Sequence, residues 1–117
     1  MATPPTLLSE LDLARIQRFC DGRVPARLRD QIRIEFEVRG GSVTILACRP
    51  PWRPANGPEW TRVPVARLRH VAAQRVWLLD WCDRNLRWHR YDGIDPSPNV
   101  DPLLAEIKAD PIAIFWG

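Results

Sequence analysis

Lysine, cysteine and long apolar runs are all scarce in this sequence of 117 residues. Its positive charges are 16 arginines and one lysine, a bias that we attribute to base composition rather than to function. No uncharged apolar run approaches the roughly 18 residues that a membrane-spanning helix needs, so we expect no membrane span. Residues 1–8 lack the basic and apolar regions of a signal peptide, and we therefore expect a cytoplasmic protein.

The three cysteines, Cys20, Cys48 and Cys82, form no C-x-x-C pair. Their odd number argues against a disulfide framework and against a zinc site, so we expect free thiols that pack as small hydrophobic residues. Two histidines without a diagnostic spacing do not indicate a metal centre. The P-loop, G-x-G-x-x-G, H-E-x-x-H and G-x-S-x-G motifs are absent, which argues against nucleotide hydrolysis and dinucleotide redox chemistry. We expect neither a metal nor a cofactor.

The remaining composition is typical of a folded protein, with 45% hydrophobic and 26% charged residues. We expect a single domain over residues 1–117, a common domain size. Residues 13–91 carry 16 arginines against seven carboxylates, whereas residues 92–117 carry five carboxylates and one lysine. The basic middle favours an anionic partner, either nucleic acid or an acidic protein. The alternative is that the acidic end pairs with arginines of the sheet inside the protein.

Two helices are expected, one near each end. Residues 10–21 have apolar positions at helical spacing, Ser9 is a good N-cap, and Gly22 suits a left-handed end of the helix. A short second helix is expected from Pro102 to about Ala109. The apolar face of the first helix consists of Leu13, Ile16, Cys20 and Val24.

Residues 31–39 alternate between apolar and charged side chains, and residues 42–48 continue the pattern after Gly40 and Gly41. Glycine adopts a positive φ freely, so the two glycines predict a tight hairpin turn. The turn and the apolar alternation predict the same register. The expected cross-strand pairs are Val38 with Val43, Phe36 with Ile45, and Ile34 with Ala47.

Four prolines make residues 49–60 a loop, which carries Trp52 and Trp60.

Residues 65–71 fit either a helix, with Pro64 at its first turn, or a strand. The alternation of arginine with apolar residues favours an edge strand, which is the interpretation that we prefer.

A second hairpin is expected from residues 75–82 and 86–91, with its turn at residues 83–85. We choose the register that separates apolar from polar side chains most cleanly. Its cross-strand pairs are Trp81 with Trp88 and Asp80 with His89. The final apolar residues are expected to form a strand or a packed tail. Together, these expected helices and strands predict an α+β fold: an antiparallel meander sheet of four to five strands, one N-terminal helix packed on a face and a short C-terminal helix.

Four segments carry a family resemblance: RPPW, WTRVPVARLRH, WCDRNLRWHRYD and DPIAIFWG. They resemble an uncharacterised bacterial family labelled domain of unknown function 3024. The resemblance runs from the first helix to Gly117. It implies a compact bacterial domain, and it brings no activity, substrate, cofactor or catalytic residue.

Arginines and tryptophans interleave between residues 49 and 91. Single-stranded nucleic acid requires this combination, because cations bind its phosphates and flat rings stack on its bases. The alternative is that arginines stack on tryptophans within the fold. The candidate contacts are Arg49, Trp52, Arg53, Trp60, Arg67, Arg69, Arg84 and Arg87.

A second hypothesis is a small metal-independent ribonuclease-like enzyme, although a protein without catalysis is preferred. The predicted register places Asp80, Arg87, His89 and Tyr91 on one face, where a carboxylate opposite an imidazole could raise its basicity. An exposed cross-strand ion pair is the simpler interpretation of the same residues. A third hypothesis is a protein-interaction module that uses the loop of prolines and tryptophans. Nothing in the sequence indicates the oligomeric state.

Overall fold

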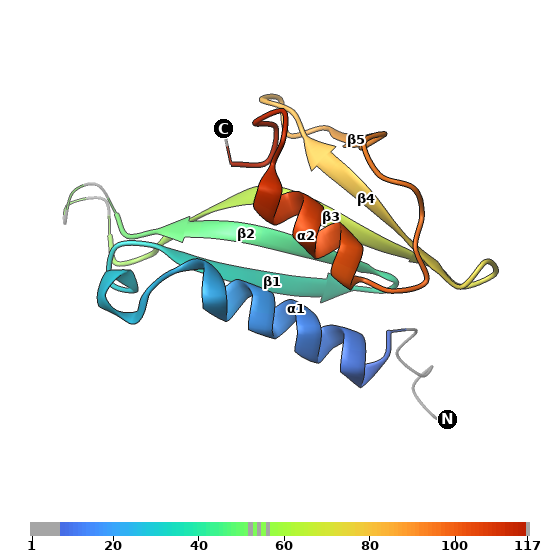
Figure 1. Ribbon diagram of the computed structural model, residues 1–117. Helices are drawn as coiled ribbons and strands as arrows, with labels where there is room; N and C mark the ends of the chain where they lie inside the picture. Colours follow the sequence, from blue (N-terminus) through green and yellow to red (C-terminus); the bar gives the residue numbers. More distant parts are fainter. Residues whose placement is uncertain (1–7, 52, 54, 56, 117) are drawn as a thin grey trace, which may run out of the picture.

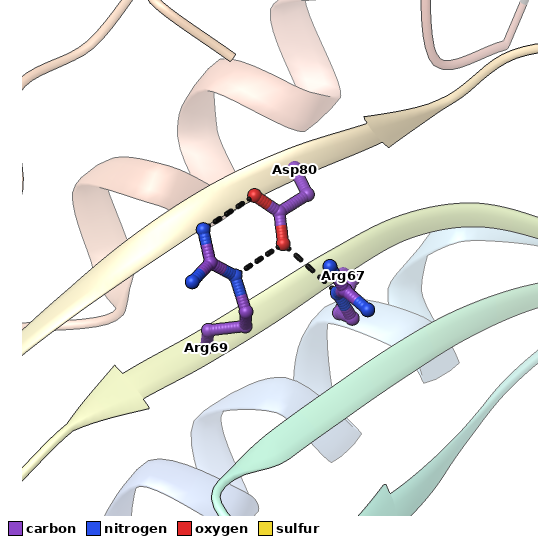
Figure 2. A network of polar contacts seen from close by, with 3 residues as sticks. All are labelled: Arg67, Arg69 and Asp80. Atoms are coloured by element: carbon purple, nitrogen blue, oxygen red, sulfur yellow. Dashed lines mark hydrogen bonds and ion pairs between the residues drawn. The ribbon is translucent and has the colours of Figure 1, made fainter. Parts of the chain in front are cut away.

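The computed structural model describes residues 8–51, 53, 55 and 57–116. The α+β prediction is confirmed: a five-stranded antiparallel sheet has the order β1-β2-β3-β4-β5, and both helices cover one of its faces (Figure 1). We call the other face, on which Arg67, Arg69 and Asp80 lie, the open face (Figure 2). In chain order the elements are α1 (Glu10–Arg23), the 3₁₀ turn η1 (Ala26–Leu28), β1 (Arg33–Arg39), β2 (Ser42–Arg49), β3 (Thr61–Val71), β4 (Val76–Cys82), β5 (Trp88–Arg90) and α2 (Asp101–Ala109).

Helix α1 begins as predicted, because the Ser9 side chain accepts a hydrogen bond of 3.0 Å from the backbone N–H of Asp12. The predicted end at Gly22 is wrong, since α1 continues to Arg23. The helix stops where Pro25 forces the preceding residue out of helical geometry, and Val24 is accordingly extended. The predicted apolar face packs on the sheet. Its buried members are Ile16, Cys20 and Val24.

The first hairpin has the predicted register, with Val38 opposite Val43 and Phe36 opposite Ile45. The turn between β1 and β2 needs Gly40, whose φ is +55°. The apolar side chains of β1 and those of Val43 and Ile45 face the helices, because successive residues of a strand point to opposite faces, whereas Leu46 points to the open face.

Replacing Gly40 with valine should lower the free energy of unfolding by about 1–3 kcal/mol, because a β-branched residue is strained at this positive φ. No heavy atom lies within 4 Å of a Cβ built at Gly40, so we expect backbone strain to be the main cost. Gly22→Ala is the matched control: the position is equally open but helical, and alanine should stabilise it by about 0.5–1 kcal/mol. Thermal unfolding of both variants checks the prediction, and an unchanged melting temperature for Gly40→Val would contradict it.

The segment that fitted either a helix or a strand is β3. It is the central strand of the sheet, so the prediction of an edge strand is wrong. Ile45 pairs with Ala66 and Leu46 pairs with Pro64, which leaves Val65 as the extra residue of a β-bulge. Proline has no backbone N–H to donate, and a bulge is one of the few places where a central strand accepts it.

The second hairpin differs from the prediction by one residue. The observed pairs are Asp80 with Arg90, Trp81 with His89 and Cys82 with Trp88. The loop between the strands has five residues instead of three, and the backbone N–H of Asp83 donates to the carbonyl of Arg87 at 2.9 Å. Leu86 lies in this longer loop with a left-handed backbone, at a φ of +63°, and its side chain is exposed. Trp81 and Trp88 therefore lie on opposite faces of the sheet, and only Trp81 packs against the core.

The core lies between the sheet and the two helices. Trp77 is fully buried beneath them, and the edge of β4 beside it is covered by Ser97, which exchanges two backbone hydrogen bonds with Trp77. Residues 111–116 form packed turns rather than a strand, and Phe115 is buried against the ring of Tyr91. Among the residues that the structure describes, no helix is long and apolar enough to span a membrane.

Candidate functional site

Six arginines project from the strands onto the open face, together with three carboxylates, which gives this face a net charge of +3. The bulge at Val65 is responsible for part of this excess. In a regular strand Arg62 and Arg67 would point to opposite faces, but the extra residue turns both to the open face. The arginines are Arg33, Arg39, Arg62, Arg67, Arg69 and Arg90, and the carboxylates are Glu35, Glu37 and Asp80.

A groove of about 500 Å³ crosses the open face. Its floor is apolar, formed by buried Leu46 and half-buried Pro64. Its walls carry three arginines, the carboxylate of Glu37, two hydroxyl groups from Ser42 and Thr44, and one aromatic ring. The arginines are Arg39, Arg62 and Arg67, and the ring is Trp88.

A second cavity, of about 420 Å³, lies between α1 and β1. Its charged residues balance, with Asp21 and Glu35 facing Arg29 and Arg33. A third cavity, of about 150 Å³, combines Arg23 with Trp116. Of these three cavities, the groove on the open face has the largest excess of positive charge beside an aromatic ring, with three arginines against Glu37.

Beside the groove, Asp80 holds two arginines of β3 (Figure 2). Its Oδ2 accepts from the Nε–H of Arg67 at 2.8 Å and from the Nε–H of Arg69 at 2.5 Å, and its Oδ1 accepts from Nη2 of Arg69 at 2.9 Å. Asp80 is 1% exposed, and it is the only buried charged residue that the structure describes. These hydrogen bonds raise the pKa of Arg69, because the carboxylate stabilises the charged guanidinium.

The Arg67 guanidinium also lies over the ring of Trp88, with 4.9 Å between Cζ and the ring centroid. Arg62 forms two exposed ion pairs, 3.6 Å from Glu37 and 3.9 Å from Glu35. Exposed pairs of this kind are weak and are screened by salt, so Arg62 remains available to an anionic ligand.

Residues 3–117, nearly the whole chain, match the model of the family described as Domain of unknown function (DUF3024). The chain belongs to the DUF3024 family. No curated protein and no solved structure matches it. Because the family carries no assigned activity, the function of this DUF3024 protein has to be inferred from its own side chains.

The predicted contact residues are spread over this DUF3024 structure rather than gathered at one place. Arg67 lines the groove, and Arg69 lies beside it. Trp60 is half-buried beneath Arg33, whose Cζ is 4.2 Å from the ring centroid, and Trp52 lies outside the described residues. The other four predicted arginines are exposed at strand ends or in loops and do not line the groove: Arg49, Arg53, Arg84 and Arg87.

The arrangement expected for a ribonuclease-like site is not formed in this DUF3024 protein. Asp80 is on the open face, whereas His89 stacks on Trp81 on the other face, with 4.6 Å between ring centroids. The register shift of one residue separates the carboxylate from the imidazole. His89 pairs instead with Asp83, at 2.7 Å between Nε2 and Oδ2. That contact, with the backbone hydrogen bonds from Arg87 and Asn85, lowers the pKa of Asp83.

The other two members of that predicted site are also apart. Tyr91 is buried, and its hydroxyl donates to Glu106 at 2.6 Å. This hydrogen bond, together with burial, raises the pKa of Tyr91 to about 12, so the phenol is a poor proton donor near neutral pH. Arg87 is exposed in the loop between β4 and β5.

The acidic end of the DUF3024 chain does not neutralise the arginines of the sheet. Among the described residues, Asp101 pairs with Arg15 of α1 at 3.6 Å, and Glu106 accepts from Tyr91. The arginines of the open face that are paired use carboxylates of the sheet itself. The predicted pairing between the acidic end and the sheet is therefore wrong.

Three groove residues were missed by reasoning from the sequence: Arg39, Arg62 and Trp88. The alternation of residues 31–39 indicates for Arg39 only a charged strand face, and the expected register pairs Trp88 with Trp81, a core residue. Pro64 was the available signal for Arg62, because proline within a strand indicates a bulge and hence a change of face.

Proposed function

We propose that this DUF3024 protein binds single-stranded nucleic acid in the groove on the open face of its sheet. The observation that supports the proposal is that three arginines and one aromatic ring line the same groove over an apolar floor. Arginines bind phosphates through paired N–H groups, and an aromatic side chain accepts any base by stacking. The residues that carry these two roles are Arg39, Arg62 and Arg67 for phosphate and Trp88 for stacking.

A single strand fits this surface better than a duplex. Unpaired bases can turn toward the sheet, where Trp88, Leu46 and Pro64 offer flat or apolar contacts. The hydroxyl groups of Ser42 and Thr44 can donate to phosphate or sugar oxygens beside the arginines. An acidic protein could use the same arginines but would not need the aromatic ring, so Trp88 distinguishes the two partners.

The test is the affinity for a labelled single-stranded RNA of about 12 nucleotides, within the range of common site sizes. Three phosphate contacts on a single strand should give a log–log slope of affinity against salt of about −2, because each contact releases counterions. Arg62→Ala should make the slope shallower by about 0.7. Arg18→Ala is the matched control, because Arg18 is an exposed arginine on α1, which covers the opposite face.

Trp88→Ala should weaken binding at every salt concentration and leave the slope unchanged, because stacking releases few ions. Fluorescence anisotropy between about 50 and 200 mM salt measures both effects. Absence of RNA binding at the lower concentration would overturn the proposal. Equal loss of affinity in the Arg18 and Arg62 variants would place the binding surface elsewhere. Tight binding to poly-glutamate without RNA binding would favour an acidic protein as the partner.

A further inference from the structure

We infer that Asp80 is a positioning residue of the nucleic-acid groove, which aims Arg67 at the ligand while Arg69 holds Asp80 in place. The inference rests on the proposed function and concerns how the groove works. Its basis is the geometry of one carboxylate between two arginines on the open face (Figure 2).

The two arginines are not equivalent. Arg69 is held by two of its nitrogens, Nε and Nη2, and it does not line the groove. Arg67 is held through Nε alone, and no described residue accepts a hydrogen bond from its Nη1 or Nη2. Arg67 therefore keeps the two terminal nitrogens of its guanidinium for an outside acceptor, and it is the one of the pair that lines the groove.

Two contacts fix the plane of the Arg67 guanidinium. The Nε–H bond to Asp80 holds one edge at 2.8 Å, and the ring of Trp88 supports one face at 4.9 Å from Cζ. A guanidinium with a fixed plane loses less conformational freedom when it binds a phosphate. Without Asp80, the Arg67 side chain would retain only the contact with Trp88.

Arg69 is needed to stabilise the charge of Asp80, because this carboxylate is buried. A carboxylate with 1% exposure requires a close cationic partner, and Arg69 supplies a two-point contact. If Arg69 lost this contact, Asp80 would draw Arg67 into a two-point pair and pull its terminal nitrogens away from the groove. Arg69 is thus expected to affect ligand affinity without touching the ligand.

Charge alone and a positioning role predict opposite changes in the RNA affinity of the Asp80→Asn variant, so the direction of the change distinguishes them. Asp80→Asn removes a negative charge from the open face, so charge alone would strengthen the binding of an anion. If Asp80 positions Arg67, the same substitution should weaken RNA binding by about tenfold, the order of one lost charge-assisted hydrogen bond. Glu37→Gln is the matched control, because it removes the same charge from the groove wall and should strengthen binding about twofold.

Arg69→Lys provides a second variant that leaves the net charge unchanged. Lysine is a point charge and cannot make the two-point contact with Asp80, so RNA binding should weaken although no charge is lost. Circular dichroism and thermal unfolding of each variant establish that it is folded under the conditions of the binding assay.

The outcomes separate the two proposals. No binding of RNA by the wild-type protein overturns the proposed function. Wild-type binding with weaker Asp80→Asn and Arg69→Lys variants supports the positioning role. Wild-type binding that becomes tighter in Asp80→Asn, as in Glu37→Gln, overturns the positioning role and leaves the groove as the site. Should Asp80→Asn fail to fold, unchanged affinity in Arg69→Lys overturns the positioning role by itself.

Discussion

Replacing Trp77 with alanine should lower the free energy of unfolding by about 3–5 kcal/mol, the range for emptying a buried aromatic site. Trp77 is 0% exposed and lies on β4 beneath the helices, with its ring 5.0 Å from the imidazole of His70. The ring lies in a close-packed core, so neighbouring side chains can fill the vacated space only in part. Equilibrium unfolding in urea, followed by circular dichroism, measures the change.

Trp88→Ala is the matched comparison, because it removes the same side chain from the other face of the sheet. Trp88 is half-buried beside Arg67, and its loss should cost about 1–2 kcal/mol, well below the cost of emptying a fully buried site. The register of the second hairpin decides this difference. Equal destabilisation by the two substitutions would contradict the observed register and would place Trp88 in the core.

The second large effect is expected at Asp110, which organises the C-terminal turns. One carboxylate oxygen accepts from the backbone N–H groups of Ile114 at 2.8 Å and Phe115 at 3.0 Å, and the other accepts from that of Trp116 at 2.9 Å. Asp110→Ala removes all three bonds and should lower the free energy of unfolding by about 3–4 kcal/mol, since hydrogen bonds to charged groups are worth about 1.5–3 kcal/mol each and do not add fully. Urea unfolding measures this change as well.

The contribution of Asp110 should depend on pH. Burial alone would raise the pKa of Asp110, but the three backbone hydrogen bonds and the nearby charge of Arg23 lower it below its ordinary value of 3.8. The stabilisation is therefore complete above the unfolded-state pKa and is lost as the pH falls through the lower folded-state pKa. The stability difference between wild type and Asp110→Asn should be constant near neutral pH and should shrink below about pH 4.

Asp95→Ala is the control for both measurements, because Asp95 is an exposed carboxylate whose side chain bonds to no described residue. It should change the stability by less than about 0.5 kcal/mol at any pH. A difference between wild type and Asp110→Asn that widens as the pH falls would contradict the role given to Asp110.

Local chemistry was sufficient to predict the first hairpin and the start of α1. Two glycines set the turn, and the alternation of Ile34, Phe36 and Val38 independently required the same register. Ser9 caps α1 through a contact within one helical turn. Each of these features depends on residues close together in the chain, so their side chains alone specify the outcome.

The second hairpin shows where this reasoning fails. Separation of polar from apolar side chains favoured a three-residue turn, but the carboxylate of Asp83 closes a longer loop by accepting from two backbone N–H groups, at 2.8 and 3.0 Å. The open face also tolerates Trp88 beside Arg67, which the rule of clean separation excluded. The predicted pairing of Asp80 with His89 depended on that register.

The sequence by itself determined the fold class, the family resemblance, the first hairpin and the basic character of the middle of the chain. The tertiary structure alone decided which arginines share a surface. The bulge at Val65 turns Arg62 to the same face as Arg67, and the longer loop places Trp88 there. The pairing of β3 with β4 places Asp80 beneath two arginines. The physical reason is that side chains alternate along a strand, so a single extra residue reverses every face that follows it, and the position of that residue depends on long-range strand pairing.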